Sequence, residues 1–327
     1  MQRPVLSLVI PMFNEELIIA ELDRRLRDFL GELPEIGASW EVVFINDGSK
    51  DQTFPMLKQL ATSEPRYKIL SFSRNFGHQA AITAGVDRAE GDAVVVMDAD
   101  LQDPPEVVRA MIARWREGND VVYAVRGKRH GETWFKRATA ALFYRLLRAM
   151  LGGISIPVDA GDFRLMSRPV VLTLRALREQ HRFVRGMVAW VGFKQVAVTY
   201  ERPARFAGET KYPLKKMIRF AVDGITSFST VPLRMATWLG VGSGLIAISV
   251  AVWAFIERIL GHVVQGWTTI MIAVTFGTCA QLLMIGILGE YVGRIYEEVK
   301  RRPLYIIGEE LNLAPPAAVT SRLSPPV

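Results

Sequence analysis

Two aspartates separated by one residue follow an apolar run in the segment Val94-Val95-Val96-Met97-Asp98-Ala99-Asp100. If the run is a strand, side chains at positions i and i+2 point to the same side of it. Two carboxylates at that place repel each other unless a divalent cation lies between them. Mg²⁺ commonly takes one or two carboxylates and completes its shell with substrate phosphates and water. The pair therefore predicts metal-assisted phosphate chemistry, and the alternative is two solvated turn residues.

A sheet is needed to position this pair, and the sequence contains five candidate strands. Apolar runs lie at 5–10, 41–45, 68–72, 93–97 and 120–124. Helical patterns separate them, the first with Leu17, Ile18, Leu22, Leu26 and Phe29 on one face. Continuous Val/Ile runs alternating with helices predict an α/β fold, with a mostly parallel sheet covered on both faces. Such sheets bind ligands beyond the carboxyl ends of their strands, where each run here has polar, turn-forming residues.

The composition narrows the classes of protein. Half of the 327 residues are hydrophobic and the net charge is +7, with a mean hydropathy of +0.18 that is high for a purely soluble enzyme. A basic balance suits anionic lipid, phosphorylated substrates or nucleic acid. The single cysteine, Cys279, excludes an internal disulfide and argues against a cysteine-based zinc site. The histidines form no close-spaced pair and are interpreted as structural: His78, His130, His181 and His262.

Two stretches without charge, 235–256 and 267–289, are each long enough to cross a hydrocarbon core, which takes about 20 residues. The short connection predicts a hairpin. The alternative, two buried core helices, is disfavoured because long helices without a polar face are rare in soluble domains. Lys and Arg gather before the first span and after the second, so the positive-inside rule places both termini in the cytoplasm. No signal peptide opens the chain, which predicts the same side.

Basic amphipathic patterns at 213–233 and 133–151 are typical of helices that lie in the headgroup layer, although an ordinary packed helix is an equal alternative for 133–151. The Pro/Ala/Ser-rich tail from about residue 314 predicts disorder. The predicted organisation is a catalytic domain over 1–212, an amphipathic juxtamembrane helix over 213–233, two membrane helices within 234–290 and a cytoplasmic C-terminal segment over 291–327.

Several segments along the chain carry a family resemblance. They are Pro11-Met12-Phe13-Asn14-Glu15-Glu16, Asn46-Asp47-Gly48-Ser49, Ser73-Arg74-Asn75-Phe76-Gly77, Met97 to Pro105, Gly161 to Met166, Gly208-Glu209-Thr210-Lys211-Tyr212 and Gly289 to Arg294. Together they resemble the family 2 glycosyltransferases of the GT-A (Rossmann-like) fold. The most similar group is that of the bactoprenol glucosyltransferases, which are related to dolichyl-phosphate mannose synthase. The similarity extends to about Gly308 and is specific for the family, but weaker for the sugar.

The resemblance implies roles for residues of the donor site. The nucleotide sugar would contact Pro11, Phe13, Glu15, Asp47, Asp98, Arg205 and Lys211. Asp47 would bind the base, while Arg205 and Lys211 flank a loop that could close over the diphosphate. Simple core packing is the alternative for Phe13. Mg²⁺ or Mn²⁺ would be held on the diphosphate by Asp98, Asp100 and Gln102.

The resemblance also implies an acceptor site. Asp162 would be the catalytic base, with a helix N-cap role or its neighbour Asp159 as alternatives. A phosphate monoester has its second pKa near ~6, so Asp162 could orient the acceptor more than it removes a proton. Arg126, Lys136 and Arg137 would bind the lipid phosphate, because arginine and lysine match phosphate oxygens.

The function that follows is inverting, metal-dependent transfer of a hexose, glucose from UDP-glucose, to undecaprenyl phosphate at the bacterial inner membrane. Alternatives keep the fold and use GDP-mannose, UDP-GlcNAc or UDP-aminoarabinose, or make the chain a non-catalytic membrane binding protein. A processive polysaccharide synthase is disfavoured because a Gln-x-x-Arg-Trp motif is missing. The resemblance further implies a homo-tetramer. Nucleic acid is not expected as a partner, because anionic lipid explains the basic residues beside the spans.

Overall fold

The computed structural model of the chain describes residues 4–33, 36, 39–127, 160–201, 229, 231–261 and 266–313. The chain divides into two compact units. The first comprises Met1–Thr139, Ser155–Lys211 and Pro303–Val327, and the second comprises Ala140–Ile154 and Tyr212–Arg302. The predicted juxtamembrane helix at 213–233 and the pattern at 133–151 lie almost wholly outside the described residues, and so does the tail from 314.

An eight-stranded sheet forms the centre of the first unit, in the order β7-β5-β6-β4-β1-β2-β3-β8. Parallel pairing joins β1 to β2 and β4, β2 to β3, and β5 to β7. β6 runs antiparallel between β4 and β5, and β8 runs antiparallel beside β3. The strands are β1 (Leu6–Met12), β2 (Trp40–Asn46), β3 (Tyr67–Phe72), β4 (Ala93–Val96), β5 (Val121–Arg126), β6 (Ala160–Ser167), β7 (Gln195–Tyr200) and β8 (Ile307–Leu311).

The five predicted runs correspond to β1 to β5, because each is a continuous apolar segment that is buried on both faces of the sheet. Three further strands were not expected. β6 carries Asp162 and Arg164, both buried, at a position for which the sequence offered a helix N-cap as an alternative role of Asp162. That alternative is wrong, because β6 is held between two neighbours by antiparallel pairing. β7 and β8 are edge strands with only partly buried side chains.

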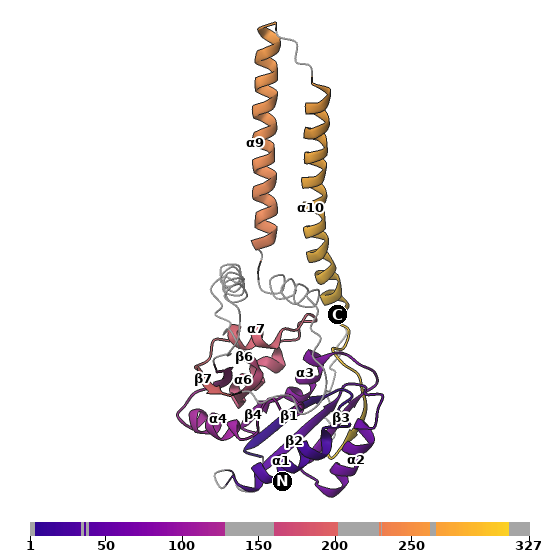
Figure 1. Cartoon of the computed structure of the whole chain (residues 1–327), viewed down its shortest axis with the longest axis vertical. Coiled ribbons are helices and arrows are strands. Elements are labelled where there is room, and N and C mark those ends of the chain that lie inside the picture. The colour runs from indigo at the N-terminus through magenta and orange to yellow at the C-terminus, as the bar shows by residue number, and fades with distance from the viewer. Residues whose placement is uncertain are drawn as a thin grey trace, which may run out of the picture. The chain divides into compact units, whose positions relative to one another are not determined.

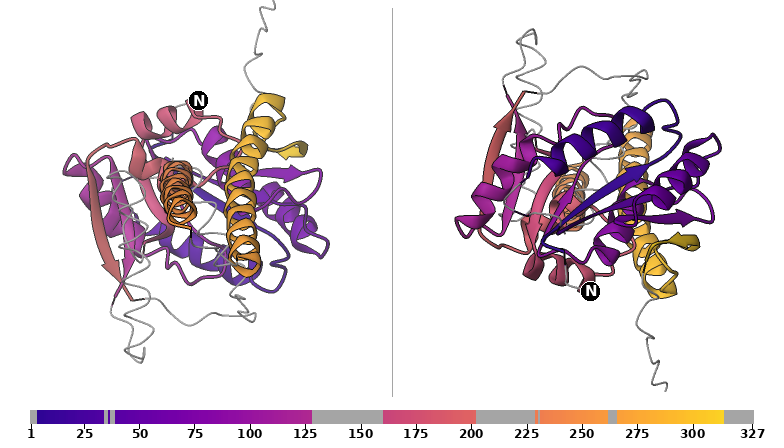
Figure 2. Two further views of the ribbon diagram at one scale, coloured as in Figure 1. Left: turned by 90° about the horizontal axis from the view of Figure 1, so that it is seen from above. Right: turned by 90° about the horizontal axis from the view of Figure 1, so that it is seen from below.

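Helices cover both faces of the sheet (Figure 1). On one face lie α1 (Ile19–Gly31), α2 (Thr53–Ser63) and α4 (Val107–Arg116), which are in front when the molecule is seen from below (Figure 2). On the other face lie α3 (His78–Arg88), α6 (Arg168–Ala176) and α7 (Val184–Trp190). The predicted apolar face of α1 is buried through Leu22, Leu26 and Phe29. The assignment of Leu17 to that face is wrong, because Leu17 precedes the helix and is 76% exposed.

The second unit contains two long helices, α9 (Val231–Ile259) and α10 (Trp267–Lys300), which contact each other. A Cβ added at Gly240 of α9 would lie 3.6 Å from Met284 Sδ of α10. The Tyr291 hydroxyl donates a 2.6 Å hydrogen bond to the Ser229 carbonyl, which ties α10 to the residues before α9. Both helices are long and apolar enough to cross a membrane, and α10 continues well beyond its uncharged stretch.

Candidate active site

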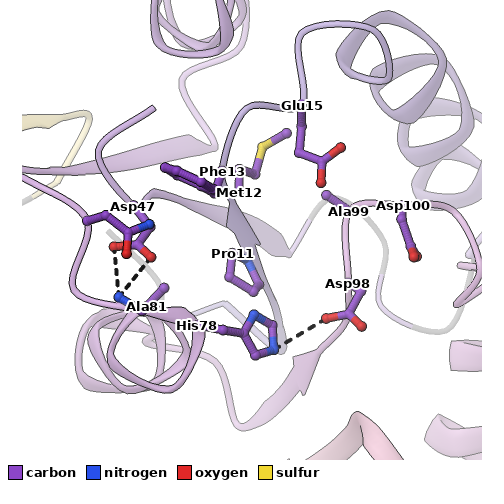
Figure 3. Close-up of a pocket in the computed structure, with 12 residues that line it drawn as sticks. Pro11, Met12, Phe13, Glu15, Asp47, His78, Ala81, Asp98, Ala99 and Asp100 are labelled. Atoms are coloured by element: carbon purple, nitrogen blue, oxygen red, sulfur yellow. Dashed lines mark hydrogen bonds and ion pairs between the residues drawn. The ribbon is translucent and has the colours of Figure 1, made fainter. Parts of the chain in front are cut away.

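A cavity of about 370 Å³ lies in the first unit, beyond the carboxyl ends of β1, β2 and β4. β1 pairs with β2 on one side and with β4 on the other, so the strand order reverses here, as at the ligand-binding crevice of open α/β sheets. The lining residues are Pro11, Met12, Phe13, Glu15, Asp47, Asn75, Gly77, His78, Ala81, Asp98, Ala99 and Asp100 (Figure 3). Predicted donor residues from three separate strands therefore meet in one cavity.

The loops after β1 and β2 brace each other and thereby shape one wall of the cavity. The Asn14 side-chain oxygen accepts the backbone N–H of Lys50 at 2.9 Å, and the Asn14 N–H donates to the Ser49 hydroxyl at 3.0 Å. The Glu15 N–H donates to the Thr53 hydroxyl at 2.8 Å. Phe13, which directly precedes Asn14, is 43% exposed. An exposed ring beside a cavity is available for stacking, so the core-packing alternative for Phe13 does not hold.

Asp47 is buried at the end of β2 and is tied to the next loop along the sheet. Its carboxylate accepts the backbone N–H of Phe76 at 2.6 Å and that of Gly77 at 2.9 Å. Burial raises the pKa of Asp47, and these two hydrogen bonds act in the opposite direction. Gly48 has φ +67°, and a Cβ there would lie 2.5 Å from the Arg74 and Asn75 backbone, so only glycine lets the two loops touch.

Asp98 and Asp100 extend from the end of β4 in a tight turn. The Asp103 carboxylate shapes this turn, since it accepts the Asp98 N–H at 3.3 Å and the Tyr200 hydroxyl at 2.9 Å. Asp100 accepts the Gln102 N–H at 3.1 Å, which closes the turn. Figure 3 shows both Asp98 and Asp100 beside the cavity. The predicted ligand Gln102 is not among the residues that line the cavity.

The surroundings of Asp98 fit a divalent cation. Its Oδ1 atom is buried without a hydrogen-bond partner. Burial raises the pKa of Asp98, and the nearby charges of Asp162 and Asp100 raise it further. A cation at Asp98 and Asp100 would relieve both effects. No cluster of three or more His, Cys, Asp or Glu suited to a metal occurs within the described parts of the chain, so phosphate and water oxygens would supply the other ligands.

His78 is a site residue that the sequence did not reveal, because a lone histidine is more often structural. It is the first residue of α3, and it lines the cavity. Its Nε2 atom lies 3.6 Å from Asp98 Oδ1 and 3.4 Å from Asp162 Oδ2. The available signal was its position directly after the Asn75-Phe76-Gly77 segment, which the family resemblance includes. His78 therefore connects the predicted metal pair to the predicted base.

Asp162 is held in an ion pair that the sequence also did not reveal. Arg185, on α7, donates to both carboxylate oxygens at 2.9 and 3.0 Å. Burial opposes ionisation of Asp162, but the hydrogen bond from His78 and the charge of Arg185 outweigh it and hold the pKa of Asp162 well below its usual range. Arg164, buried beside them, has its pKa lowered to about 10 by burial. The ion pair with Arg185 therefore favours the ionised form of Asp162.

The structure does not describe the side chains of the other predicted site residues. Arg205 and Lys211 of the donor set, Lys136 and Arg137 of the acceptor set, and Asp159 lie outside the described residues. Arg126 is the last residue of β5, and its side chain is not described. Their roles stay predictions from the sequence.

Comparisons with known proteins decide the family. The family described as "Glycosyl transferase family 2" matches residues 7–175, which include Asp47, Asp98, Asp100 and Asp162. The chain belongs to this family. It is a glycosyltransferase, as the resemblance of its motifs predicted. The site geometry agrees, because the four aspartates converge on or beside one cavity at the switch point of the sheet.

Relatives of this glycosyltransferase align along nearly its whole length. It is 50% identical to "Uncharacterized glycosyltransferase YkcC" of Bacillus subtilis, over 94% of each chain. It is 43% identical to "Prophage bactoprenol glucosyl transferase homolog" of Escherichia coli, over 92% of this chain and 98% of the relative. Among solved structures, glucosyl-3-phosphoglycerate synthase from Mycobacterium tuberculosis overlaps 68% of this chain and 76% of its own, at 20% identity and a TM-score of 0.45.

Proposed function

We propose that this glycosyltransferase moves glucose from UDP-glucose to undecaprenyl phosphate, with inversion at the anomeric carbon and with Mg²⁺ or Mn²⁺ at Asp98 and Asp100. The observation that carries the acceptor class is the Arg185–Asp162 pair beside the cavity. Support for the lipid carrier also comes from relatives that are named bactoprenol glucosyl transferases. The other donors, GDP-mannose, UDP-GlcNAc and UDP-aminoarabinose, are alternatives that share this site.

The donor would lie across the carboxyl ends of β1, β2 and β4. Phe13 offers an exposed ring for the nucleoside, and Asp47 lies on the same side of the cavity as Phe13 in Figure 3. Asp98 and Asp100 would hold the metal on the diphosphate, and Gln102 stays a candidate ligand. The bound metal would neutralise negative charge on the leaving diphosphate.

The low basicity of Asp162 selects the kind of acceptor. A sugar hydroxyl must lose its proton as it attacks, and an aspartate paired with Arg185 cannot take that proton effectively. A phosphate monoester is largely dianionic at neutral pH because its second pKa is about 6. Its oxygen can form the new bond to the anomeric carbon without losing a proton, while the bond pair of the broken C–O bond leaves with UDP. Asp162 then acts by holding Arg185 and His78 in place.

The two apolar helices would anchor the enzyme where a polyprenyl phosphate exposes its headgroup. Arg126, Lys136 and Arg137 are the candidate ligands of that phosphate, and Arg205 and Lys211 those of the diphosphate. We place the catalytic domain and both termini in the cytoplasm and the hairpin in the bacterial inner membrane, with a homo-tetramer as the proposed assembly.

A transfer assay tests the proposal. Purified full-length protein in detergent would receive undecaprenyl phosphate, Mg²⁺ or Mn²⁺, and one radiolabelled donor from the four named. We expect label in the lipid fraction from UDP-glucose, in the β-anomer by NMR, and no label when EDTA is added. Asp98→Asn should lower the rate by at least about 100-fold because charge on the leaving group is no longer neutralised. Asp28→Asn, an exposed change on α1, is the matched control.

The same assay separates the alternatives. Undecaprenol, which presents a neutral hydroxyl, should not be labelled, since Asp162 paired with Arg185 would accept its proton poorly. Labelling of the alcohol at a rate similar to that of the phosphate would contradict the acceptor argument. Label from a different donor alone would replace glucose in the proposal. No labelled lipid from any donor, with protein of normal thermal stability, would overturn the lipid acceptor.

A further inference from the structure

The segment that follows α10 returns to the catalytic unit and pairs with an edge of its sheet. β8 extends the sheet beside β3, with Ile307 opposite Phe72. The Asn312 side chain donates to the backbone carbonyls of Ala61 and Tyr67 at 2.7 and 2.9 Å. An exposed ion pair joins Glu309 to Lys58, and a partly buried one joins Glu310 to Arg88. β8 is therefore held at this edge by side-chain hydrogen bonds and ion pairs as well as by strand pairing.

Tyr305, just before β8, has the most extensive contacts of this segment. Its ring stacks on Phe72 with centroids 5.2 Å apart and an interplanar angle of 13°. Its hydroxyl donates to Asp87 at 2.8 Å, and Arg178 donates to the same Asp87 oxygen at 2.7 Å. The side chain is thus fixed at both ends, by an aromatic ring and by a charged hydrogen bond.

The contacts of Tyr305 lead to the cavity. Phe72, the last residue of β3, meets Phe76 edge-on at 5.6 Å. The Ser73 N–H donates to the Ile306 carbonyl at 3.0 Å, so the neighbour of Tyr305 also holds the first residue of the loop 73–77. At the other end of this loop, Phe76 and Gly77 donate their N–H groups to Asp47. Asn75 and Gly77 line the cavity.

The loop 73–77 packs against the Gly48 turn through the Arg74 and Asn75 backbone, and its two ends are held by Ile306 and by Asp47. Ser73, Arg74 and Asn75 are exposed, and Arg74 bonds within the loop itself, to the Asn75 carbonyl at 3.0 Å. Gly77 adopts φ +98°, which gives the loop a conformation that the backbone does not favour for other residues. The two Asp47 hydrogen bonds require both N–H groups to point at one carboxylate. Small displacements of Phe76 would misalign them.

We propose that Tyr305 is a positioning residue of the donor pocket, which holds the loop 73–77 against Asp47 through Phe72 and Phe76. The C-terminal segment thereby becomes part of the donor site although it lies more than 200 residues from Asp47 along the chain. The identification of the cavity as a nucleotide pocket rests on the proposed function. The claim that Tyr305 holds the loop is independent of the proposed function.

Hydrogen exchange of the full-length protein in detergent tests this claim without nucleotide. The variants are Tyr305→Ala, Tyr305→Phe, which keeps the stacked ring, and Glu309→Gln, which loses only an exposed ion pair on the same segment. We expect Tyr305→Ala to accelerate exchange about three- to tenfold in peptides that cover 73–77, because the variant loses one aromatic pair. Exchange of the β1 and β2 peptides should not change. Tyr305→Phe and Glu309→Gln should match the wild type within about twofold.

Nucleotide affinity supplies the functional readout. Calorimetry with UDP and Mn²⁺, and with GDP and Mn²⁺, should show a Kd raised about three- to tenfold by Tyr305→Ala and restored by Tyr305→Phe. Unchanged loop exchange in Tyr305→Ala, or acceleration of equal size in all strands, would overturn the role of Tyr305. A wild-type protein that binds neither nucleotide would instead contradict the proposed donor class, and loop exchange would then decide the role of Tyr305 by itself.

Discussion

At the scale of single residues, the chemistry of the site depends on which charges are paired. Asp98 has a buried oxygen without a hydrogen bond, whereas Asp162 has two hydrogen bonds from Arg185 and His78 at 3.4 Å. The two aspartates therefore differ in basicity, and the pKa of Asp98 is raised while that of Asp162 is lowered. One is suited to a cation, and the other is suited to fixing the cationic side chains around it.

Arg185→Leu should reveal how strongly Asp162 depends on its partner. Removing Arg185 leaves the buried Asp162 charge with only His78 and Arg164 beside it among the described neighbours, and breaking such a buried ion pair costs about 3 kcal/mol of unfolding free energy at neutral pH. Asp162→Asn added to Arg185→Leu should restore part of this loss. Urea unfolding in detergent at pH 7 measures both effects. Arg24→Leu, which breaks exposed pairs on α1, is the control and should leave the unfolding midpoint unchanged.

The pH dependence of the same variant follows from linkage. In the wild type, the pKa of Asp162 lies below its unfolded value of about 3.9, so its stabilisation is present above that pH and is lost as pH falls. In Arg185→Leu, the loss of this cation should raise the pKa of Asp162, although His78 and Arg164 still lower it, so protonation of Asp162 or of His78 reduces the charge imbalance. The stability difference between variant and wild type should therefore become smaller from pH 7 to pH 5. A constant difference would contradict the assigned pairing.

At the scale of elements, close packing of α3 on the sheet positions His78 and Gly77 at the cavity. Gly85 permits this approach, because a Cβ there would lie 2.2 Å from Val9 Cγ1 and 2.7 Å from Ile45 Cδ1. The valine side chain is stiff, so the helix itself would have to move away from β1. The spacing between helix and strand therefore depends on this one glycine.

Gly85→Ala should destabilise the protein although alanine is the better helix former. Helix propensity favours alanine by about 1 kcal/mol, but overpacking of a filled core costs about 1–3 kcal/mol. The expected net loss is up to about 2 kcal/mol of unfolding free energy by urea titration. Gly31→Ala, at the end of α1, is the matched control, since a Cβ added there would have no atom within 4 Å. A stabilised Gly85→Ala variant would show that α3 can shift without cost.

At the scale of the whole molecule, the two apolar helices carry the proposal that the enzyme works at a membrane. α9 and α10 expose large apolar side chains over most of their length, among them Trp238, Phe255, Phe276 and Leu288. Surfaces of this kind are rarely left in water, because each buried methylene contributes about 0.8 kcal/mol. In the proposed membrane anchor, lipid would cover these side chains.

Cysteine labelling tests the proposed topology. In a Cys279→Ser background, Gly261→Cys places a thiol at the end of the first span, and Glu309→Cys places one after the second. An impermeant maleimide added to intact cells should label position 261 and should label position 309 only after permeabilisation. The reverse pattern would invert the topology. Labelling of both positions in intact cells, with the membrane shown to be sealed, would contradict the hairpin.

Much of this protein could be predicted from local sequence. The strands β1 to β5 are continuous apolar runs, and the two spans are uncharged stretches, so each is encoded by neighbouring residues. The acidic pair after β4 could be predicted as a ligand site because parallel strands bring their carboxyl ends together. These predictions succeed because hydrophobic periodicity and turn chemistry act over a few residues.

Tertiary structure alone decided the rest. His78 lies between Asp98 and Asp162, Arg185 fixes Asp162, and Tyr305 stacks on Phe72, and each contact joins residues distant in sequence. β6 is held as a strand by antiparallel pairing with β4 and β5, which lie far from it in sequence or across a long connection. The physical reason is that a charged side chain acquires its basicity, and an edge segment its conformation, from groups that only the folded chain brings within a few ångströms.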